Sequence, residues 1–204
     1  MSHIQLFFFS LFGLHVLRIL KAKGNHGLIR RKIKCLIEKA MWDENLVEAC
    51  EKGNIYMVNC ALDQGAKDYD FAMGKAAENG HMDIVLFMLK SGAKDYDFAM
   101  ARAARSVYMK IVSLMLNLGA KNYSWAMVEA SRGGFITIVK FFMSLGASDY
   151  CSSLSVAVYE KHVDIVLLIL ETMKIKKIKV DTLFWSTEMS DFFNICIDGK
   201  IKIS

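Results

Sequence analysis

Proline is absent from all 204 residues of this sequence. Proline interrupts helices more strongly than any other residue, because its ring removes a backbone N–H and clashes with the preceding turn. Its absence, together with a hydrophobic content of 54%, favours long uninterrupted helices. A chain of this length can bury one sizeable core. We therefore expect one all-α domain, alone or with short appendages.

Cysteine is scarce and scattered. The five cysteines are odd in number and no two have C-x-x-C spacing, so the sequence supports neither a disulfide-dense fold nor a zinc site. His81 and His162 stand far apart with no third ligand beside them. We expect reduced thiols, a cytoplasmic location, and neither a metal nor a cofactor.

The common catalytic and nucleotide-binding motifs are missing as well. The sequence contains no G-x-x-x-x-G-K-[ST], G-x-G-x-x-G, H-E-x-x-H or G-x-S-x-G. Its only glycine pair, Gly133-Gly134, falls at a turn between helices in the repeat pattern described below. Cysteine and histidine have no third partner with which to form a nucleophilic site. We expect no enzymatic activity and no small-molecule substrate.

The net charge of +5 is not a property of the central part of the chain. Residues 1–39 contain eight Lys/Arg and one acidic residue, residues 40–172 contain twelve and sixteen, and residues 173–204 contain six and four. A nucleic-acid-binding body would place its basic residues along one face. Because the central block is mildly acidic, nucleic acid is not the expected partner.

What the sequence does contain is a strict internal repeat. The stretch "GAKDYDFAM" occurs at residues 65–73 and again at 92–100, which is a step of 27 residues. Further positions follow the same step: Gly65, Gly92, Gly119, Gly146; Tyr69, Tyr96, Tyr123, Tyr150; Ala76, Ala103, Ala130, Ala157; Ile84, Ile111, Ile138, Ile165. Five units result, at about residues 38–64, 65–91, 92–118, 119–145 and 146–172.

Each unit has the pattern of two amphipathic helices. Apolar residues recur at positions 72, 73, 76 and 77 and then at 84, 85, 88 and 89, which is the spacing of one helical face. Glycine can end a helix in the left-handed conformation, and Asp68, with its equivalents Asp95, Asn122 and Asp149, can cap the first helix. One pair of helices cannot bury its apolar faces, but a stack of pairs can. The repeat therefore predicts an α-solenoid of helix-turn-helix units.

The stretch "AAENGHMDIVLFML" at residues 76–89 resembles the second half of an ankyrin repeat, with its alanine pair, Gly-His turn and Val/Ile-rich helix. The resemblance covers about residues 43–172. Ankyrin units run to about 33 residues, so these are shorter, and the shortening falls where an ankyrin has its β-hairpin finger. The resemblance implies short loops in place of fingers. Such compact units are similar to ankyrin proteins of large DNA viruses, which would imply host proteins as partners and the host cytoplasm as location.

Positions that vary within the constant frame are the candidates for binding. Adjacent units align each variable column into a row of charges and aromatic rings, which is suited to a protein partner. A merely solvated face, or a repeat remnant with no partner, remains the alternative. The candidate residues are Lys75, Glu78, Arg102, Arg105, Tyr108, Glu129, Arg132, Phe135 and Tyr159.

One turn departs from the pattern. Val107 occupies the position of the turn glycine in the third unit. A β-branched residue is strained in the left-handed conformation. We therefore expect this turn to take another geometry.

The two ends of the chain do not follow the repeat. Residues 4–20 are strongly apolar and are followed by basic residues, so they are either a capping helix, with a further degenerate helix at 25–41, or a membrane anchor that leaves the repeats in the cytoplasm. Residues 1–42 thus form an N-terminal segment. Residues 173–204 form a C-terminal cap or tail, with a possible hairpin turn at Asp198-Gly199. A monomer is expected.

Overall fold

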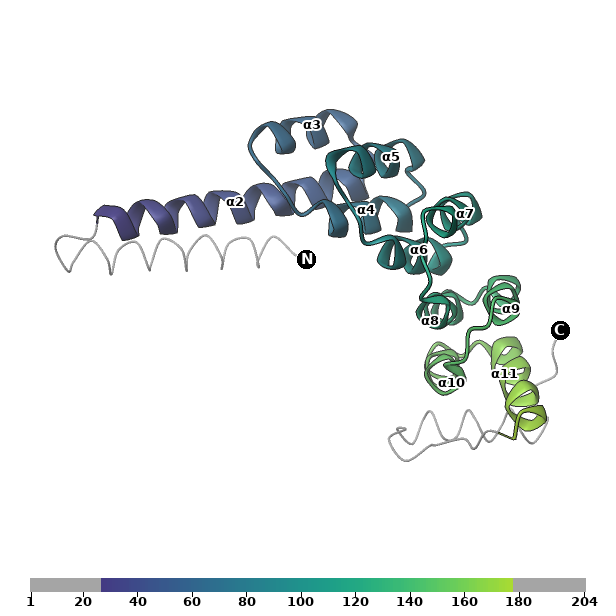
Figure 1. Cartoon of the computed structure of the whole chain (residues 1–204). Helices are drawn as coiled ribbons and strands as arrows, with labels where there is room; N and C mark the ends of the chain where they lie inside the picture. Colours follow the sequence, from purple (N-terminus) through teal and green to yellow (C-terminus); the bar gives the residue numbers. More distant parts are fainter. Residues whose placement is uncertain (1–26, 178–204) are drawn as a thin grey trace.

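The computed structural model describes residues 27–177, which form ten α-helices and no strand (Figure 1). This confirms the all-α fold expected from the sequence. The helices are α2 (Gly27–Glu51), α3 (Ile55–Asp63), α4 (Tyr69–Glu78), α5 (Met82–Ser91), α6 (Tyr96–Arg105), α7 (Met109–Asn117), α8 (Tyr123–Gly133), α9 (Ile136–Ser144), α10 (Tyr150–Tyr159) and α11 (Val163–Ile175).

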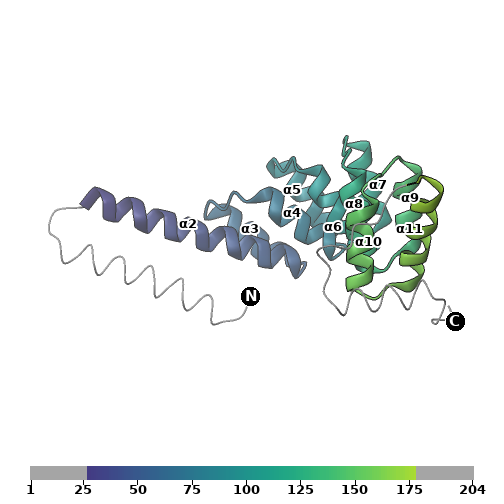
Figure 2. The ribbon, with the colours of Figure 1, turned by 90° about the horizontal axis from the view of Figure 1, so that it is seen from below.

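The helices form two layers that run along a solenoid. The first helix of each unit packs on the first helix of the next, from the end of α2 through α4, α6 and α8 to α10. The second helices, α3, α5, α7, α9 and α11, each pair with the first helix of their own unit. Figures 1 and 2 show these pairs following one another. The stacked helix-turn-helix arrangement predicted from the repeat is confirmed.

The core consists of the constant columns of the repeat. Alanine fills the contacts between first helices, and Ala76, Ala103 and Ala130 are fully buried. Small side chains let neighbouring helix backbones approach closely, and larger ones fill the space between the layers. The larger core residues are Met73, Met100 and Met127 from the first helices and Ile84, Ile111, Ile138, Ile165, Met88, Met115, Phe142 and Ile169 from the second.

Short loops join the units, at residues 64–68, 92–95, 118–122 and 145–149. Each ends in a residue whose side chain caps the next helix: Asp95 Oδ1, for example, accepts a hydrogen bond of 2.9 Å from the amide of Phe98. The same bond is made by Asp68, Asn122 and Asp149. A free amide of the first helical turn is thereby satisfied. The predicted caps and short loops are confirmed.

A second set of side chains holds each loop to the unit before it. Asp97 Oδ1 accepts hydrogen bonds from the amides of Lys121, at 2.7 Å, and Asn122, at 2.8 Å. We call these side chains the loop clamps; Asp43 and Asp70 act in the same way on the two preceding loops, and Ser124 Oγ accepts one bond from Ser148. The two aspartates of "KDYD" therefore have different roles, since Asp95 caps its own helix and Asp97 clamps the next loop.

The N-terminal boundary differs from the prediction. Instead of a separate helix at residues 25–41, α2 runs without a break from Gly27 to Glu51 and supplies the first helix of the first unit. The boundary placed between residues 42 and 43 therefore falls inside a helix. After Gly27 the segment contains neither glycine nor proline, so no residue in it favours an end.

The prediction for the turn at Val107 is wrong. Val107 takes the left-handed conformation, with φ of 69°, and Lys161 does the same in the fifth unit, with φ of 63°. The amide of Tyr108 donates to the carbonyl of Ala103 at 3.0 Å, and His81 makes the same bond to Ala76 at 2.9 Å. This bond closes the end of the first helix in both units. The stack therefore imposes one turn geometry, against a local cost of about 1–2 kcal/mol for a non-glycine residue.

The apolar segment 4–20 and the possible hairpin at Asp198-Gly199 lie outside the described residues. Within residues 27–177, no helix combines the length and the apolar character needed to cross a bilayer.

Candidate functional site

The first helices of the units present one shared face. Residues three and four apart lie on the same side of a helix, so Phe71, Lys75 and Glu78 of α4 form one such row. The equivalent rows are Phe98, Arg102 and Arg105 in α6, Trp125, Glu129 and Arg132 in α8, and Ser152, Val156 and Tyr159 in α10. We call this surface the first-helix face. Since α4, α6, α8 and α10 pack side by side, the rows are contiguous.

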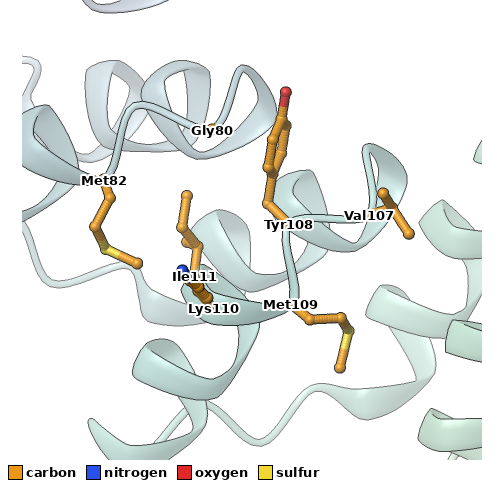
Figure 3. Close-up of a pocket in the computed structure, with 7 residues that line it drawn as sticks. All are labelled: Gly80, Met82, Val107, Tyr108, Met109, Lys110 and Ile111. Carbon is orange, nitrogen blue, oxygen red and sulfur yellow. The ribbon is translucent and has the colours of Figure 1, made fainter.

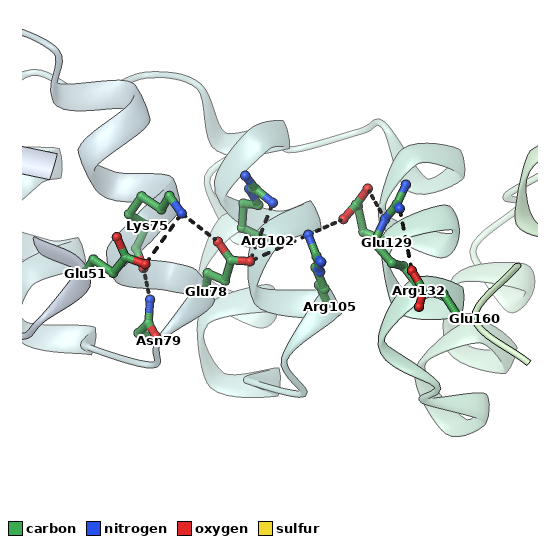
Figure 4. A network of polar contacts seen from close by, with 9 residues as sticks. All are labelled: Glu51, Lys75, Glu78, Asn79, Arg102, Arg105, Glu129, Arg132 and Glu160. Carbon is green, nitrogen blue, oxygen red and sulfur yellow. Dashed lines mark hydrogen bonds and ion pairs between the residues drawn. The ribbon is translucent and has the colours of Figure 1, made fainter. Parts of the chain in front are cut away.

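Charged side chains on this face form an unbroken series of ion pairs across all five units (Figure 4). We call this series the charged ladder. Its members alternate in sign, and their N···O distances lie between 3.3 and 4.0 Å. In order along the solenoid they are Glu51, Lys75, Glu78, Arg102 with Arg105, Glu129, Arg132 and Glu160.

Glutamates are the junctions of the ladder. Glu78 contacts three cations, Lys75 at 3.6 Å, Arg102 at 3.5 Å and Arg105 at 3.8 Å. Glu129 contacts Arg105 at 3.7 Å and accepts a hydrogen bond of 3.3 Å from Arg132 Nε. The face is therefore close to neutral, although each of its members is charged.

The ladder is half-buried and its hydrogen-bonding capacity is incompletely used. The Glu129 side chain is only 11% exposed. Glu78 Oε2, Arg102 Nε and Glu129 Oε2 are buried and have no hydrogen-bond partner among the described residues. Buried polar atoms normally have such a partner, because a buried donor or acceptor without a hydrogen bond lowers the stability of the fold.

The structure brings together six of the nine residues that the sequence singled out. Lys75, Glu78, Arg102, Arg105, Glu129 and Arg132 belong to the charged ladder. The other three lie apart from it. Tyr108 and Phe135 are in turns between helices, and Tyr159 is 66% exposed at the end of α10.

Beside the ladder lies an aromatic row, Phe71, Phe98 and Trp125, which is not among the candidate residues predicted from the sequence. The ring centroids of Phe71 and Phe98 are 5.6 Å apart, and those of Phe98 and Trp125 are 5.8 Å apart. Arg102 lies over the Phe98 ring at 5.2 Å, which links the row to the ladder. Phe71 is 40% exposed. The signal was present in the sequence, because residues 71, 98 and 125 follow the repeat step four positions before Lys75, Arg102 and Glu129.

At the turns, a ring of the second, third and fifth units covers the glycine of the unit before: His81 lies against Gly53, Tyr108 against Gly80 and His162 against Gly134. Nε2 of His81 lies 3.2 Å from the carbonyl oxygen of Glu51, and Nε2 of His162 lies at the same distance from that of Arg132. The two histidines thus hold the turn backbone of the preceding unit. Close packing explains why residue 133 is glycine, since a Cβ there would stand 2.2 Å from the carbonyl oxygen of Arg105.

The described residues offer little to a metal or a nucleophilic mechanism. No three of their His, Cys, Asp and Glu side chains come together in a way that could hold a metal ion. Cys50, Cys60 and Cys151 are free thiols. Burial raises the pKa of Cys50 to about 12, so it is a neutral thiol and a poor nucleophile at neutral pH.

Neither the models of known protein families nor the sequences of curated proteins match this chain.

Proposed function

We propose that this chain is a non-catalytic, ankyrin-type repeat protein that binds another protein through its first-helix face. The observation that carries the proposal is the juxtaposition of the charged ladder with the aromatic row over three successive units. Aromatic residues and arginine are enriched in protein interfaces and among their energetically dominant residues. A solvated surface needs neither half-buried charges nor aligned rings.

The ladder suits recognition of a polypeptide because it offers donors and acceptors in alternation. The more exposed cations of the ladder, Arg105 and Arg132, can donate to a partner. The more exposed carboxylates, Glu51 and Glu160, can accept from one. The neighbouring rings of Phe71, Phe98 and Trp125 would cover apolar side chains of the same partner. We further propose a cytoplasmic location, which the free thiols support, and host proteins as partners if the chain is viral.

The test is affinity purification from a cell extract with the tagged full chain. The variant Lys75→Glu/Arg102→Glu/Arg132→Glu reverses three ladder cations and should lose the proteins recovered with the wild type. The matched control reverses three exposed lysines away from the ladder, Lys90→Glu/Lys121→Glu/Lys140→Glu, and should retain them. Circular dichroism establishes that each variant is folded.

Reversing charges inside a ladder could also unfold it, so a second variant is needed. Phe71→Ala removes an exposed ring and leaves every ion pair in place. It should weaken recovery of the same proteins. Identical recovery with the triple variant and with Phe71→Ala would refute binding through this face and favour a repeat remnant without a partner.

A further inference from the structure

A pocket of about 320 Å³ lies at the turns of the second and third units (Figure 3). Its lining residues are Gly80 and Met82 of the second unit and Val107, Tyr108, Met109, Lys110 and Ile111 of the third. The first-helix face described above includes none of them. Ladder residues nevertheless precede it directly in the chain, since Glu78 stands two residues before Gly80 and Arg105 two before Val107.

The pocket arises from substitutions in the third unit. Tyr108 stands where the second and fifth units have histidine, and its ring covers Gly80, where a Cβ would lie 2.2 Å from the ring. A tyrosine ring carries no nitrogen that could bond to the turn of the preceding unit, as His81 and His162 do. Val107 replaces a glycine and adds an apolar side chain beside it.

The lining is apolar on its floor and partly exposed at its rim. Ile111 is 2% exposed, whereas Tyr108 is 39% and Val107 46% exposed. In the view of Figure 3, Met82 and Tyr108 lie on either side of Ile111. Methionine side chains adapt to differently shaped apolar groups. A volume of about 320 Å³ is at the lower limit of pockets that hold a small ligand or one side chain of a partner.

Positive charge predominates on the third-unit side of the pocket. Lys110 is the one charged residue of the lining. The third and fourth units, residues 92–145, contain seven basic residues against three acidic ones, Asp95, Asp97 and Glu129. Arg105, two residues before Val107, is already paired with Glu78 and Glu129, so Lys110 is the cation that a ligand in the pocket would meet. A negatively charged partner is therefore favoured at this site.

We infer that this pocket receives a bulky apolar side chain from an acidic peptide segment of the partner. The apolar residue enters between Met82 and Tyr108, and acidic residues beside it in the peptide face Lys110. The inference rests on the proposed function, because it takes the chain to be a protein-binding solenoid. It adds a specific anchor and the charge of the partner, which the neutral ladder does not determine.

The experiment uses the full chain labelled with [methyl-¹³C]methionine, and the probe is a synthetic peptide with acidic residues on both sides of a single leucine. Substitutions Met82→Leu and Met109→Leu assign the two methyl signals. The leucine peptide should shift both signals in a saturable manner. A peptide with serine in place of leucine should bind at least about fivefold more weakly, because it cannot fill an apolar pocket.

Lys110→Glu tests the charge and should leave the fold intact, because Lys110 is exposed in the first turn of α7, where an acidic residue is favourable. It should weaken binding of the leucine peptide by about fivefold. The matched control, Lys140→Glu, changes the net charge equally at an exposed site outside the lining and should leave binding nearly unchanged.

Three results would overturn the inference: equal binding of the serine peptide, equal effects of Lys110→Glu and Lys140→Glu, or no shift of the two methyl signals at millimolar peptide. A DNA oligonucleotide that displaces the leucine peptide and shifts the same methyls more strongly would instead identify a polyanion site. If the peptide fails while the ladder variants still lose their partners in affinity purification, the pocket assignment fails and the proposed function stands.

Discussion

Each unit has a loop edge, where it joins the next unit, and a turn edge, where its two helices meet, and both edges place a residue in the left-handed conformation. At the loop edge, Gly119 and Gly146 have no atom within 4 Å of where a Cβ would stand. At the turn edge, a Cβ on Gly80 would lie 2.2 Å from the ring of Tyr108, and one on Gly134 would lie 2.7 Å from that of His162.

The two edges therefore hold the stack together by different means. The loop edge uses the loop clamps, which are aspartate in three units and serine in a fourth, and hydrogen-bond to backbone amides that any sequence supplies. The turn edge uses side-chain rings, which differ from unit to unit. A loop clamp constrains only the one side chain that bonds to the backbone amides. At the turn edge, a ring of one chemistry can replace a ring of another, as tyrosine replaces histidine at residue 108, and still cover the turn. Variation, and the pocket that it creates, is accordingly found at the turn edge.

The largest expected effect is that of Gly133→Ala at the turn edge. A Cβ at this position would stand 2.2 Å from the backbone oxygen of Arg105, so a helix must shift. We expect a loss of about 3 kcal/mol in the free energy of unfolding, the upper part of the usual range for overpacking. Urea unfolding followed by circular dichroism measures it. The control at the loop edge, Gly146→Ala, incurs conformational strain alone and should lose about 1 kcal/mol. Equal losses of stability for the two variants would show that the turn edge is no more closely packed than the loop edge.

An intermediate effect is expected when a loop clamp is removed. Asp97→Ala leaves the amides of Lys121 and Asn122 without their carboxylate acceptor. Hydrogen bonds to charged groups contribute about 1.5–3 kcal/mol, and partial exposure of this site places the expected loss near 2 kcal/mol. Ser124→Ala removes one neutral bond of 3.0 Å and should lose less than about 1 kcal/mol. The same urea measurement applies, and a larger loss for Ser124→Ala would contradict the role given to the clamps.

The smallest expected effect is a gain in stability, from replacing Val107 by glycine. Val107→Gly relieves the left-handed conformation of a β-branched residue at a side chain that is 46% exposed. We expect the unfolding free energy to rise by about 1 kcal/mol. Lys161→Gly, at the equivalent turn of the fifth unit, should change it in the same direction. If thermal melting shows that Val107→Gly is instead destabilised, the valine side chain contributes more to the turn edge through packing than it costs in strain.

Most of the fold was predictable because the repeat determines it locally. A cap acts over three residues and an amphipathic face over one or two turns, so the sequence around Asp95 or Ala103 already indicates their roles. The continuity of α2 was harder to predict, since its first half carries no repeat pattern. Val107 was predicted wrongly because its intrinsic preference opposes the geometry that neighbouring units impose.

The candidate site was predictable only as a set of columns. The step of 27 residues placed Lys75, Arg102 and Glu129 in one row, but it did not indicate that Glu78 would contact three cations from two helices. Nor did it show that Phe71, Phe98 and Trp125 would lie ring against ring. Such contacts depend on the spacing and rotation between stacked helices, which no single unit contains.

By itself, the sequence determined the length of the unit, its two helices, their caps and the buried columns, because these follow from backbone conformation and apolar periodicity within one unit. Only the tertiary structure decided how the second aspartate of "KDYD" clamps the next loop, how charges of alternating sign join into one ladder, and where two turns enclose a pocket. Each of these needs contacts between residues about one repeat apart, whose energy depends on how one unit is placed against the next.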